Sequence, residues 1–317
     1  MMEFELQIIR WLQSLRNGFL DTLFEFFTMF GEELIVIAVL GGIYWCVNKK
    51  VGERLGITVF ISLGFNSLLK VVFMRLRPFM VDESIVNLRP ETSGGYSMPS
   101  GHAQSASTVF FGVYQFFKKN YLLAIAIVVT TLVSISRMYI GVHYLSDVLA
   151  GSLLGIIITY LMYRLIGKRE DLSLIYKFIL ILSLVSLVGF FIYNIVILNK
   201  DYFDSFQFYF NTEALAKMFG TLVGFVIGIK LEKKYVNFTN HDNLLKNAIR
   251  FVLGITVIFL TRLVLKELFH LIVNPDNLVY DQMFASILAS FLDFIRYVIM
   301  VIVGLGLYPM LFKKIKI

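Results

Sequence analysis

The sequence predicts an all-α, polytopic helical membrane protein, because of its composition and the length of its apolar runs. Of the 317 residues, 58% are apolar and 16% are charged, whereas soluble domains are about 45–50% apolar. Apolar stretches of about 18 residues or more recur along the chain, and each is long enough to cross a bilayer as a helix. A helix satisfies its own backbone hydrogen bonds, as a lipid environment requires.

Residues 1–30 have a mixed character that separates them from the segments that follow. Charged side chains at Arg10, Arg16, Asp21 and Glu25 interrupt an otherwise apolar sequence. This pattern is typical of an amphipathic helix that lies in the membrane interface. We therefore expect an N-terminal amphipathic interfacial segment at residues 1–30, without a cleaved signal peptide.

Nine apolar segments follow, and we expect each of them to span the membrane. They cover residues 31–48, 55–74, 102–117, 121–137, 143–165, 173–197, 214–231, 248–270 and 283–311. Lysine and arginine collect in the loops on one face, at residues 49–54, 118–119, 164–177, 230–234, 246–250 and 313–316. Such loops mark the cytoplasmic side, so the net charge of +7 reflects membrane orientation and not a nucleic-acid partner. We expect a multi-pass protein of the cell membrane.

The loop between the second and third predicted spans contains most of the prolines. Pro78, Pro90 and Pro99 fall there together with Gly94 and Gly95, and the whole chain has five prolines. Such residues mark turns rather than membrane spans. A structured loop of this length is typically functional, so its two ends are candidate positions for chemistry.

Cationic and hydroxyl side chains stand at both ends of this loop. Lys70 and Arg77 lie where the second span ends, and they either bind an anion or only anchor the helix at the interface. Ser100 and Gly101 open the third span together with His102. A helix N-terminus presents free N–H groups that suit an anion, although Ser100 would also serve as an ordinary N-cap.

A third polar group lies between the fourth and fifth predicted spans. Arg137 closes the fourth span, and His143 and Asp147 open the fifth. A spacing of four places the imidazole and the carboxylate on one helical face. The carboxylate would fix the tautomer and leave the other nitrogen free as a nucleophile, or the pair would only tie the helix. All three groups lie on the same non-cytoplasmic face, which favours a shared anionic ligand.

Together these residues resemble the signature of the type 2 phosphatidic acid phosphatase superfamily of membrane lipid phosphatases. That signature has a lysine and an Arg-Pro pair with six residues between them, then Pro-Ser-Gly-His, then Ser-Arg followed by histidine and aspartate. Every position is met here, with five residues between Arg137 and His143 and three between His143 and Asp147. The resemblance covers roughly residues 30–170. It implies a six-helix phosphatase core at residues 31–197 and about three additional transmembrane helices in residues 198–317.

The resemblance also implies a role for each residue of the site. His143 would attack phosphorus and form a phosphohistidine, Asp147 would orient its ring, and His102 would protonate the leaving group and then activate water. The phosphate would be bound by Lys70, Arg77, Ser100, Gly101 and Arg137. We expect no cofactor and no metal, because the sequence shows no Cys/His or carboxylate cluster with ligand spacing.

The C-terminal half contains two further patterns. Gly220, Gly224 and Gly228 recur every four residues, and such a small-residue stripe predicts close helix packing. Arg262 and Asp293 lie at a similar depth in the last two predicted spans. We expect these two residues to form a structural salt bridge.

The preferred hypothesis is a metal-independent membrane phosphatase for a lipid phosphate or a polyprenyl diphosphate, with its active site facing outside or the lumen. One alternative is a glucose-6-phosphatase-like sugar-phosphate phosphatase, which the predicted nine-span layout favours, and another is a lipid phosphotransferase. A non-catalytic transporter or scaffold belongs to a different class. The His143–Asp147 pair argues against it, because binding alone needs no nucleophile.

Overall fold

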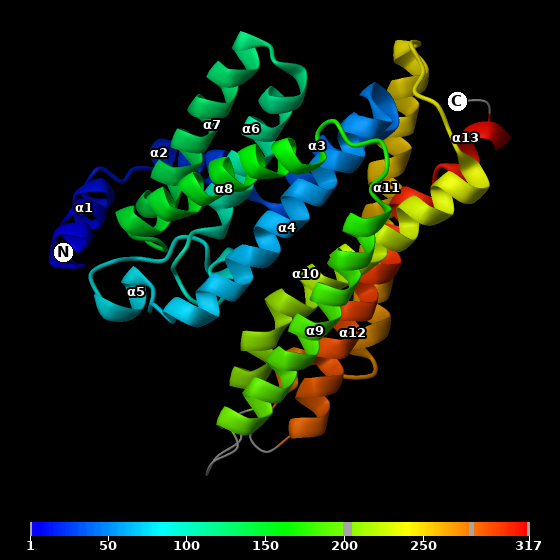
Figure 1. The fold of residues 1–317 in the computed structure, drawn as a ribbon. Coiled ribbons are helices and arrows are strands. Elements are labelled where there is room, and N and C mark those ends of the chain that lie inside the picture. The colour runs from blue at the N-terminus through cyan, green and yellow to red at the C-terminus, as the bar shows by residue number, and fades with distance from the viewer. Residues whose placement is uncertain (1, 199–204, 279–281, 316–317) are drawn as a thin grey trace. The chain divides into compact units, whose positions relative to one another are not determined.

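The computed structural model describes residues 2–198, 205–278 and 282–315, and within these ranges the chain forms helices and loops but no strand (Figure 1). The all-α prediction is therefore confirmed. The chain divides into two compact units. The first comprises Met1–Leu40 and Arg54–Arg169, and the second comprises Gly41–Glu53 and Glu170–Ile317.

The first unit is built from the helices of the N-terminal half. They are α1 (Met2–Ser14), α2 (Gly18–Thr28), α3 (Glu33–Gly42), α4 (Lys49–Phe73), α5 (Pro78–Val81), α6 (Gly101–Phe117), α7 (Asn120–Tyr139) and α8 (Leu145–Ile166). Single turns at Met29–Gly31 (η1) and Pro90–Thr92 (η3) complete the first unit. The C-terminal end of α3 and the N-terminal end of α4 belong to the second unit.

Helix α6 packs against both α7 and α8 at the centre of the first unit (Figure 1). Helix α8 approaches the start of α6 closely at Gly151 of α8. A Cβ atom at this position would lie 2.4 Å from the carbonyl oxygen of Ser100. The contact brings the first turn of α8 next to the first residue of α6. These two helix starts carry most of the predicted site residues.

The N-terminal helix α1 buries its apolar face in this unit. Leu6 and Ile9 pack in a cluster with Tyr139, Ile140 and Tyr144 from the end of α7 and the loop that follows it. The N-terminal segment is helical at residues 2–14 and 18–28, and one apolar face of α1 is buried. Its place in the membrane interface stays a prediction.

The second unit contains the C-terminal helices. They are α9 (Ser173–Leu198), α10 (Ser205–Leu231), α11 (Leu244–His270), α12 (Met283–Ile302) and α13 (Met310–Lys314), with short helical turns η2 (Ile43–Val47), η4 (Glu232–Val236), η5 (Pro275–Asn277) and η6 (Val303–Leu307).

Helices α10 and α12 pack along the glycine stripe that the sequence predicts (Figure 1). A Cβ atom on Gly220 would lie 2.3 Å from the carbonyl oxygen of Phe294, and one on Gly224 would lie 2.6 Å from that of Val298. The small residues thus let the two backbones approach, which confirms the prediction of close packing.

The predicted salt bridge between Arg262 and Asp293 is corrected by the structure. Asp293 pairs with Arg296 at 2.5 Å, three residues along the same helix, and accepts a hydrogen bond of 2.8 Å from the Tyr209 hydroxyl. Depth in the membrane was the only basis of the prediction. The partner of Asp293 is set by its direction around the α12 axis, which depth does not define.

Each predicted span coincides with a helix or helical segment in the described part of the chain. Six helices there are long and apolar enough to cross a membrane, and a seventh span results if the bent pair Gly18–Gly31 and Glu33–Val47 is one crossing. Helix α6 has 17 residues, close to the shortest length that spans a bilayer, whereas α9 has 26 residues. The chain is a multi-pass integral membrane protein, and nine crossings remain a prediction.

Candidate active site

Lys70 and Arg77 lie at the junction of α4 with the long loop. Lys70 is in the last turn of α4, and its Nζ donates to the carbonyl oxygen of Tyr96. Arg77 precedes the proline that opens α5 and donates to the carbonyl oxygens of Gly95, Gly94 and Val142 at 2.8, 2.6 and 2.9 Å. Arg77 is only 2% exposed, so it is not an interfacial anchor. These contacts are with neutral oxygens, which do not cancel the charge.

Ser100 stands at the N-cap position of α6 but does not cap the helix with its side chain. Its hydroxyl is fully buried and has no hydrogen-bond partner, while its backbone N–H donates to the Asp147 carbonyl at 3.0 Å. Leaving a buried polar group unsatisfied costs about 1–3 kcal/mol. An unpaired hydroxyl in this position is suited to donate to a ligand. Gly101 follows as the first helical residue.

His102 carries a second buried polar atom without a hydrogen bond. Its Nε2 has no hydrogen-bond partner and lies 4.0 Å from the carboxylate of Glu32. Glu32 in turn pairs with Arg89 at 2.8 Å. Unsatisfied buried groups are uncommon in folded proteins, so the pair Ser100 and His102 marks a position that a polar ligand would complete.

His143 and Asp147 form the predicted pair at the start of α8. The His143 ring lies just before the helix, and its Nδ1 is 3.4 Å from Oδ2 of Asp147. The same oxygen accepts the Tyr144 N–H at 2.9 Å. On the other side of the ring, Nε2 is 3.4 Å from Nη1 of Arg77. His143 and Asp147 are 1% and 0% exposed.

The surroundings of His143 keep its imidazole neutral. Burial and the nearby guanidinium groups of Arg77 and Arg137, followed by Lys70, hold the pKa of His143 well below its usual value. A neutral ring with its Nδ1–H directed at Asp147 leaves a lone pair on Nε2. That is the form in which histidine acts as a nucleophile.

Arg137 is fully buried in the last turn of α7. Its guanidinium donates to the Thr28 hydroxyl at 3.0 Å and to the hydroxyl and carbonyl oxygens of Thr92 at 3.3 and 3.2 Å. These contacts bring the end of α2 and the turn η3 to the site. The sequence indicated Arg137 but gave no sign of either threonine.

The structure thus brings the predicted residues together around His143. Arg77, Arg137, Lys70 and His102 all act electrostatically on its ring. Ser100 lies next to this group because its backbone N–H donates to the carbonyl oxygen of Asp147. A tetrahedral anion at this position would face several positive groups and two unpaired polar atoms.

Sequence reasoning missed the residues that surround Asp147 on its other side. Arg75 donates from Nη1 to Oδ1 of Asp147 at 2.8 Å and from Nη2 to Oε2 of Glu5 at 2.6 Å. A signal was present in the segment Arg75-Leu76-Arg77. Arg77 donates instead to the carbonyl oxygens of Gly95, Gly94 and Val142, so the two arginines serve different neighbours. Nothing comparable in the sequence marks Glu5.

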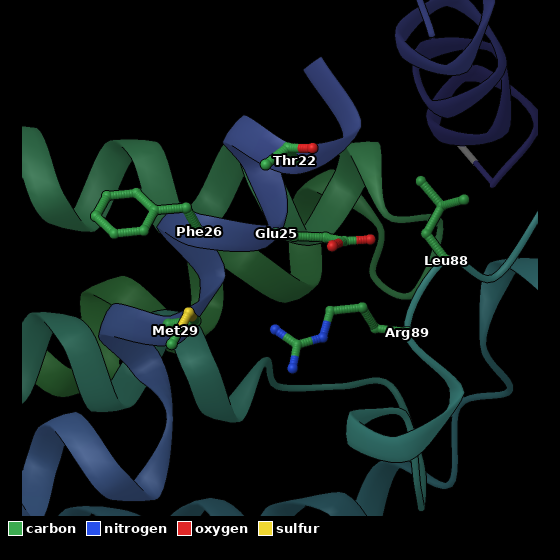
Figure 2. A pocket seen from close by; sticks show the side chains of 6 residues that line it. All are labelled: Thr22, Glu25, Phe26, Met29, Leu88 and Arg89. Atoms are coloured by element: carbon green, nitrogen blue, oxygen red, sulfur yellow. The ribbon is translucent and has the colours of Figure 1, made fainter. Parts of the chain in front are cut away.

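A pocket of about 340 Å³ lies beside the site in the first unit. Its lining is half polar and half apolar and consists of Thr22, Glu25, Phe26, Met29, Leu88 and Arg89. Figure 2 shows the Arg89 guanidinium extending toward Met29 across the pocket. Because Arg89 pairs with Glu32, the carboxylate next to His102, the pocket adjoins the His102 side of the site.

Fold and site together define a multi-pass membrane protein with a buried cluster of histidine and cationic side chains. The comparisons place it more narrowly. The family model described as PAP2 superfamily matches residues 54–171, and that of the PAP2 superfamily phosphatase transmembrane extension matches residues 216–317. The chain belongs to the PAP2 superfamily, the family that the signature motifs predict.

Individual relatives match about half of the chain. The chain is 32% identical to a probable sphingosine-1-phosphate phosphatase of Dictyostelium discoideum over 49% of this chain and 40% of the relative. It is 31% identical to an undecaprenyl-diphosphatase of Sulfolobus acidocaldarius over 50% of this chain and 76% of the relative. The chain therefore spans less than half the length of the first of these and most of the second.

Two solved structures each match about half of the chain. A PAP2-type phosphatidylglycerolphosphate phosphatase from Bacillus subtilis is 27% identical, covers 54% of this chain and 88% of its own, and superposes with a TM-score of 0.46. The LpxE protein of Aquifex aeolicus is 25% identical over 51% of this chain and 95% of its own, with a TM-score of 0.47.

Proposed function

We propose that this protein is a metal-independent membrane phosphatase that hydrolyses a lipid phosphate or polyprenyl diphosphate through a phosphohistidine intermediate on the non-cytoplasmic side. One observation carries the proposal. The neutral ring of His143 lies between a buried carboxylate and a buried guanidinium, with Nε2 directed to the cationic side. This arrangement suits a nucleophile that attacks a bound anion.

In the first step, Nε2 of His143 attacks phosphorus and the bond from phosphorus to the leaving oxygen breaks. His102 donates a proton to that oxygen, and Asp147 stabilises the positive charge that His143 acquires. In the second step, His102 takes a proton from water while the water oxygen attacks phosphorus. The P–N bond then breaks, and inorganic phosphate and neutral His143 remain.

The buried cations supply the charge that both steps require. Lys70 and Arg77 donate to carbonyl oxygens, which are neutral and do not compensate a cationic side chain. A phosphoryl group would gain charge-assisted hydrogen bonds from them and from the Ser100 hydroxyl. Such preorganised donors stabilise the charge that develops on the equatorial oxygens.

Two observations support a lipid substrate. The named relatives act on phosphorylated lipids, as sphingosine-1-phosphate phosphatase, undecaprenyl-diphosphatase and phosphatidylglycerophosphatase B. The pocket on the His102 side, where the leaving group would depart, has the apolar side chains Phe26, Met29 and Leu88 in its lining. A sugar has little apolar surface to place against such a lining.

The test is phosphate release by the purified protein from a panel of substrates. The panel contains phosphatidic acid, sphingosine 1-phosphate, undecaprenyl diphosphate and glucose 6-phosphate, each measured with excess EDTA. We expect release from at least one lipid and not from glucose 6-phosphate, with no effect of EDTA. His143→Ala should abolish release, and His241→Ala, at an exposed loop histidine, should not.

Two results would contradict the proposal. Equal release by wild type and by His143→Ala would remove the nucleophile. Activity on glucose 6-phosphate alone would support the sugar-phosphate alternative in place of a lipid phosphatase.

A further inference from the structure

Arg75 is positioned between two carboxylates that come from distant parts of the first unit. It donates to Glu5 of α1 at 2.6 Å and to Asp147 of α8 at 2.8 Å, and also to the Ser146 hydroxyl at 2.6 Å. Its guanidinium lies over the Tyr144 ring, 3.8 Å from the centroid. Both terminal nitrogens of the planar guanidinium thus donate to carboxylates, which is the geometry that arginine provides.

Glu5 is buried although it belongs to an amphipathic surface-type helix. It is 4% exposed, and its second oxygen accepts the backbone N–H of Ser146 at 2.7 Å. Burial alone would raise the pKa of Glu5, but the hydrogen bonds from Ser146 and Arg75 outweigh it and lower that pKa. The ionised carboxylate therefore caps the first turn of α8, next to the catalytic pair.

The two oxygens of Asp147 are divided between two tasks. Oδ1 accepts from Arg75, while Oδ2 accepts the Tyr144 N–H and faces Nδ1 of His143. Arg75 and the Tyr144 amide hold the carboxylate from both sides. The rotation that would take Oδ2 away from His143 is thereby prevented.

We propose that Glu5 and Arg75 are positioning residues for Asp147, and through it for His143, so that helix α1 is part of the catalytic apparatus. The proposal rests on the function proposed above. Arg75 fixes the carboxylate, and Glu5 fixes Arg75 and the start of α8. Neither residue touches the phosphate.

The chain provides a matched control for a purely structural role of α1. Arg10, also on α1, pairs with Asp82 at 2.8 Å and with Glu3 at 3.0 Å. The Arg10–Asp82 pair attaches α1 to the end of α5 without contacting Asp147. Arg10→Ala therefore weakens the attachment of α1 and leaves the Arg75 bridge in place.

The first experiment compares the kinetics of Arg75→Lys, Glu5→Gln and Arg10→Ala on the lipid that the wild type hydrolyses. Lysine keeps the charge but cannot bind both carboxylates in the plane of a fork. We expect kcat to fall in Arg75→Lys by about 100-fold, the loss that a misplacement of about 1 Å can produce, with KM and inhibition by orthovanadate unchanged. Glu5→Gln should show a smaller fall of the same type, and Arg10→Ala should keep the wild-type kcat.

The second experiment does not depend on turnover. The chain has four histidines, so ¹⁵N-histidine labelling gives few signals, and His143→Gln assigns that of His143. We expect wild type and Arg10→Ala to show His143 with its proton on Nδ1 and in a hydrogen bond. Arg75→Lys should lose that signature in the folded protein.

The outcomes separate this proposal from the proposed function. An unchanged His143 signal in Arg75→Lys, or equal losses of kcat in Arg75→Lys and Arg10→Ala, would overturn the positioning role. A rise in KM and in the vanadate inhibition constant would make Arg75 a phosphate ligand instead. A wild type that releases no phosphate but shows the expected signals would contradict the proposed function and leave the positioning role supported.

Discussion

The residues that would bind phosphate also set the protonation state of the nucleophile. Arg77 and Arg137 would attract the anion, and they hold the pKa of His143 well below its usual value. The ring is therefore neutral before substrate arrives, and Asp147 can stabilise the charge that appears on attack. In the proposed mechanism, one set of side chains thus serves both binding and activation.

Ser100→Ala should separate function from stability. The hydroxyl is buried without a partner, so its removal should leave the melting temperature unchanged or slightly raised. Loss of one phosphate donor should lower kcat/KM by about 10²–10³-fold, as in an oxyanion hole. Thermal unfolding and phosphate release of the same preparation test both parts. A fall in stability together with unchanged activity would show that Ser100 is only structural.

The sequence indicated the residues of the proposed phosphate site more readily than those behind them. His143, Asp147 and the cations belong to motifs whose chemistry is visible in the residue types. Arg75 differs from Arg77 only by the direction of its side chain, which depends on the backbone after α4. Glu5 accepts a hydrogen bond from Ser146, which lies 141 residues away in sequence. No local sequence pattern encodes that contact.

Among the helices, small residues and single ion pairs fix the packing. Gly220 and Gly224 set the distance between α10 and α12, and Arg10 with Asp82 attaches α1 to the loop after α5. The helices themselves were predictable, because apolar run length defines a membrane helix. The rotation of each helix about its own axis was not predictable. The pairing of Asp293 with Arg296 in place of Arg262 shows this.

Gly224→Leu should destabilise the second unit. A side chain there meets the Val298 carbonyl, and such overpacking typically costs about 1–3 kcal/mol. Gly189→Leu on α9 is the control, because nothing lies within 4 Å of a Cβ atom at that position. Thermal unfolding in detergent should show a lower midpoint for Gly224→Leu only. Equal midpoints for the two variants would contradict the close contact.

The attachment of α1 should depend on acidic pH. Hydrogen bonds from Ser84 and Arg10 lower the pKa of Asp82 from 3.8 to about 2. Because the folded pKa is the lower one, this stabilisation is present above about pH 4 and is lost as pH falls through about 2. Asp82→Asn should therefore reduce the melting temperature at pH 6 and have little effect near pH 2. Glu83→Gln, at an exposed neighbour, is the control, and a constant difference between wild type and Asp82→Asn at both pH values would contradict the account.

At the scale of the whole molecule, the account depends on the side of the membrane that the site faces. Loop charge predicts the non-cytoplasmic side, where a lipid phosphate of the outer leaflet would be reached. The single cysteine, Cys46, makes this prediction simple to test, because one replacement removes all native thiols.

We predict opposite labelling of two exposed loop positions in a Cys46→Ser background. Glu83→Cys lies in the long loop of the site, and Lys168→Cys lies in the basic loop after α8, both at exposed residues. A membrane-impermeant maleimide should label Glu83→Cys in intact cells and Lys168→Cys only after permeabilisation. The reverse pattern would place the site in the cytoplasm.

The central claim is that His143 forms a covalent bond to phosphorus, and trapping that intermediate tests it most directly. Acid-free rapid quenching of the wild type during turnover of the lipid substrate, followed by peptide mass spectrometry, should find phosphate on the peptide that contains His143. His143→Gln should show none. Phosphate on another residue, or turnover without any phosphoenzyme in rapid-quench measurements, would contradict the account.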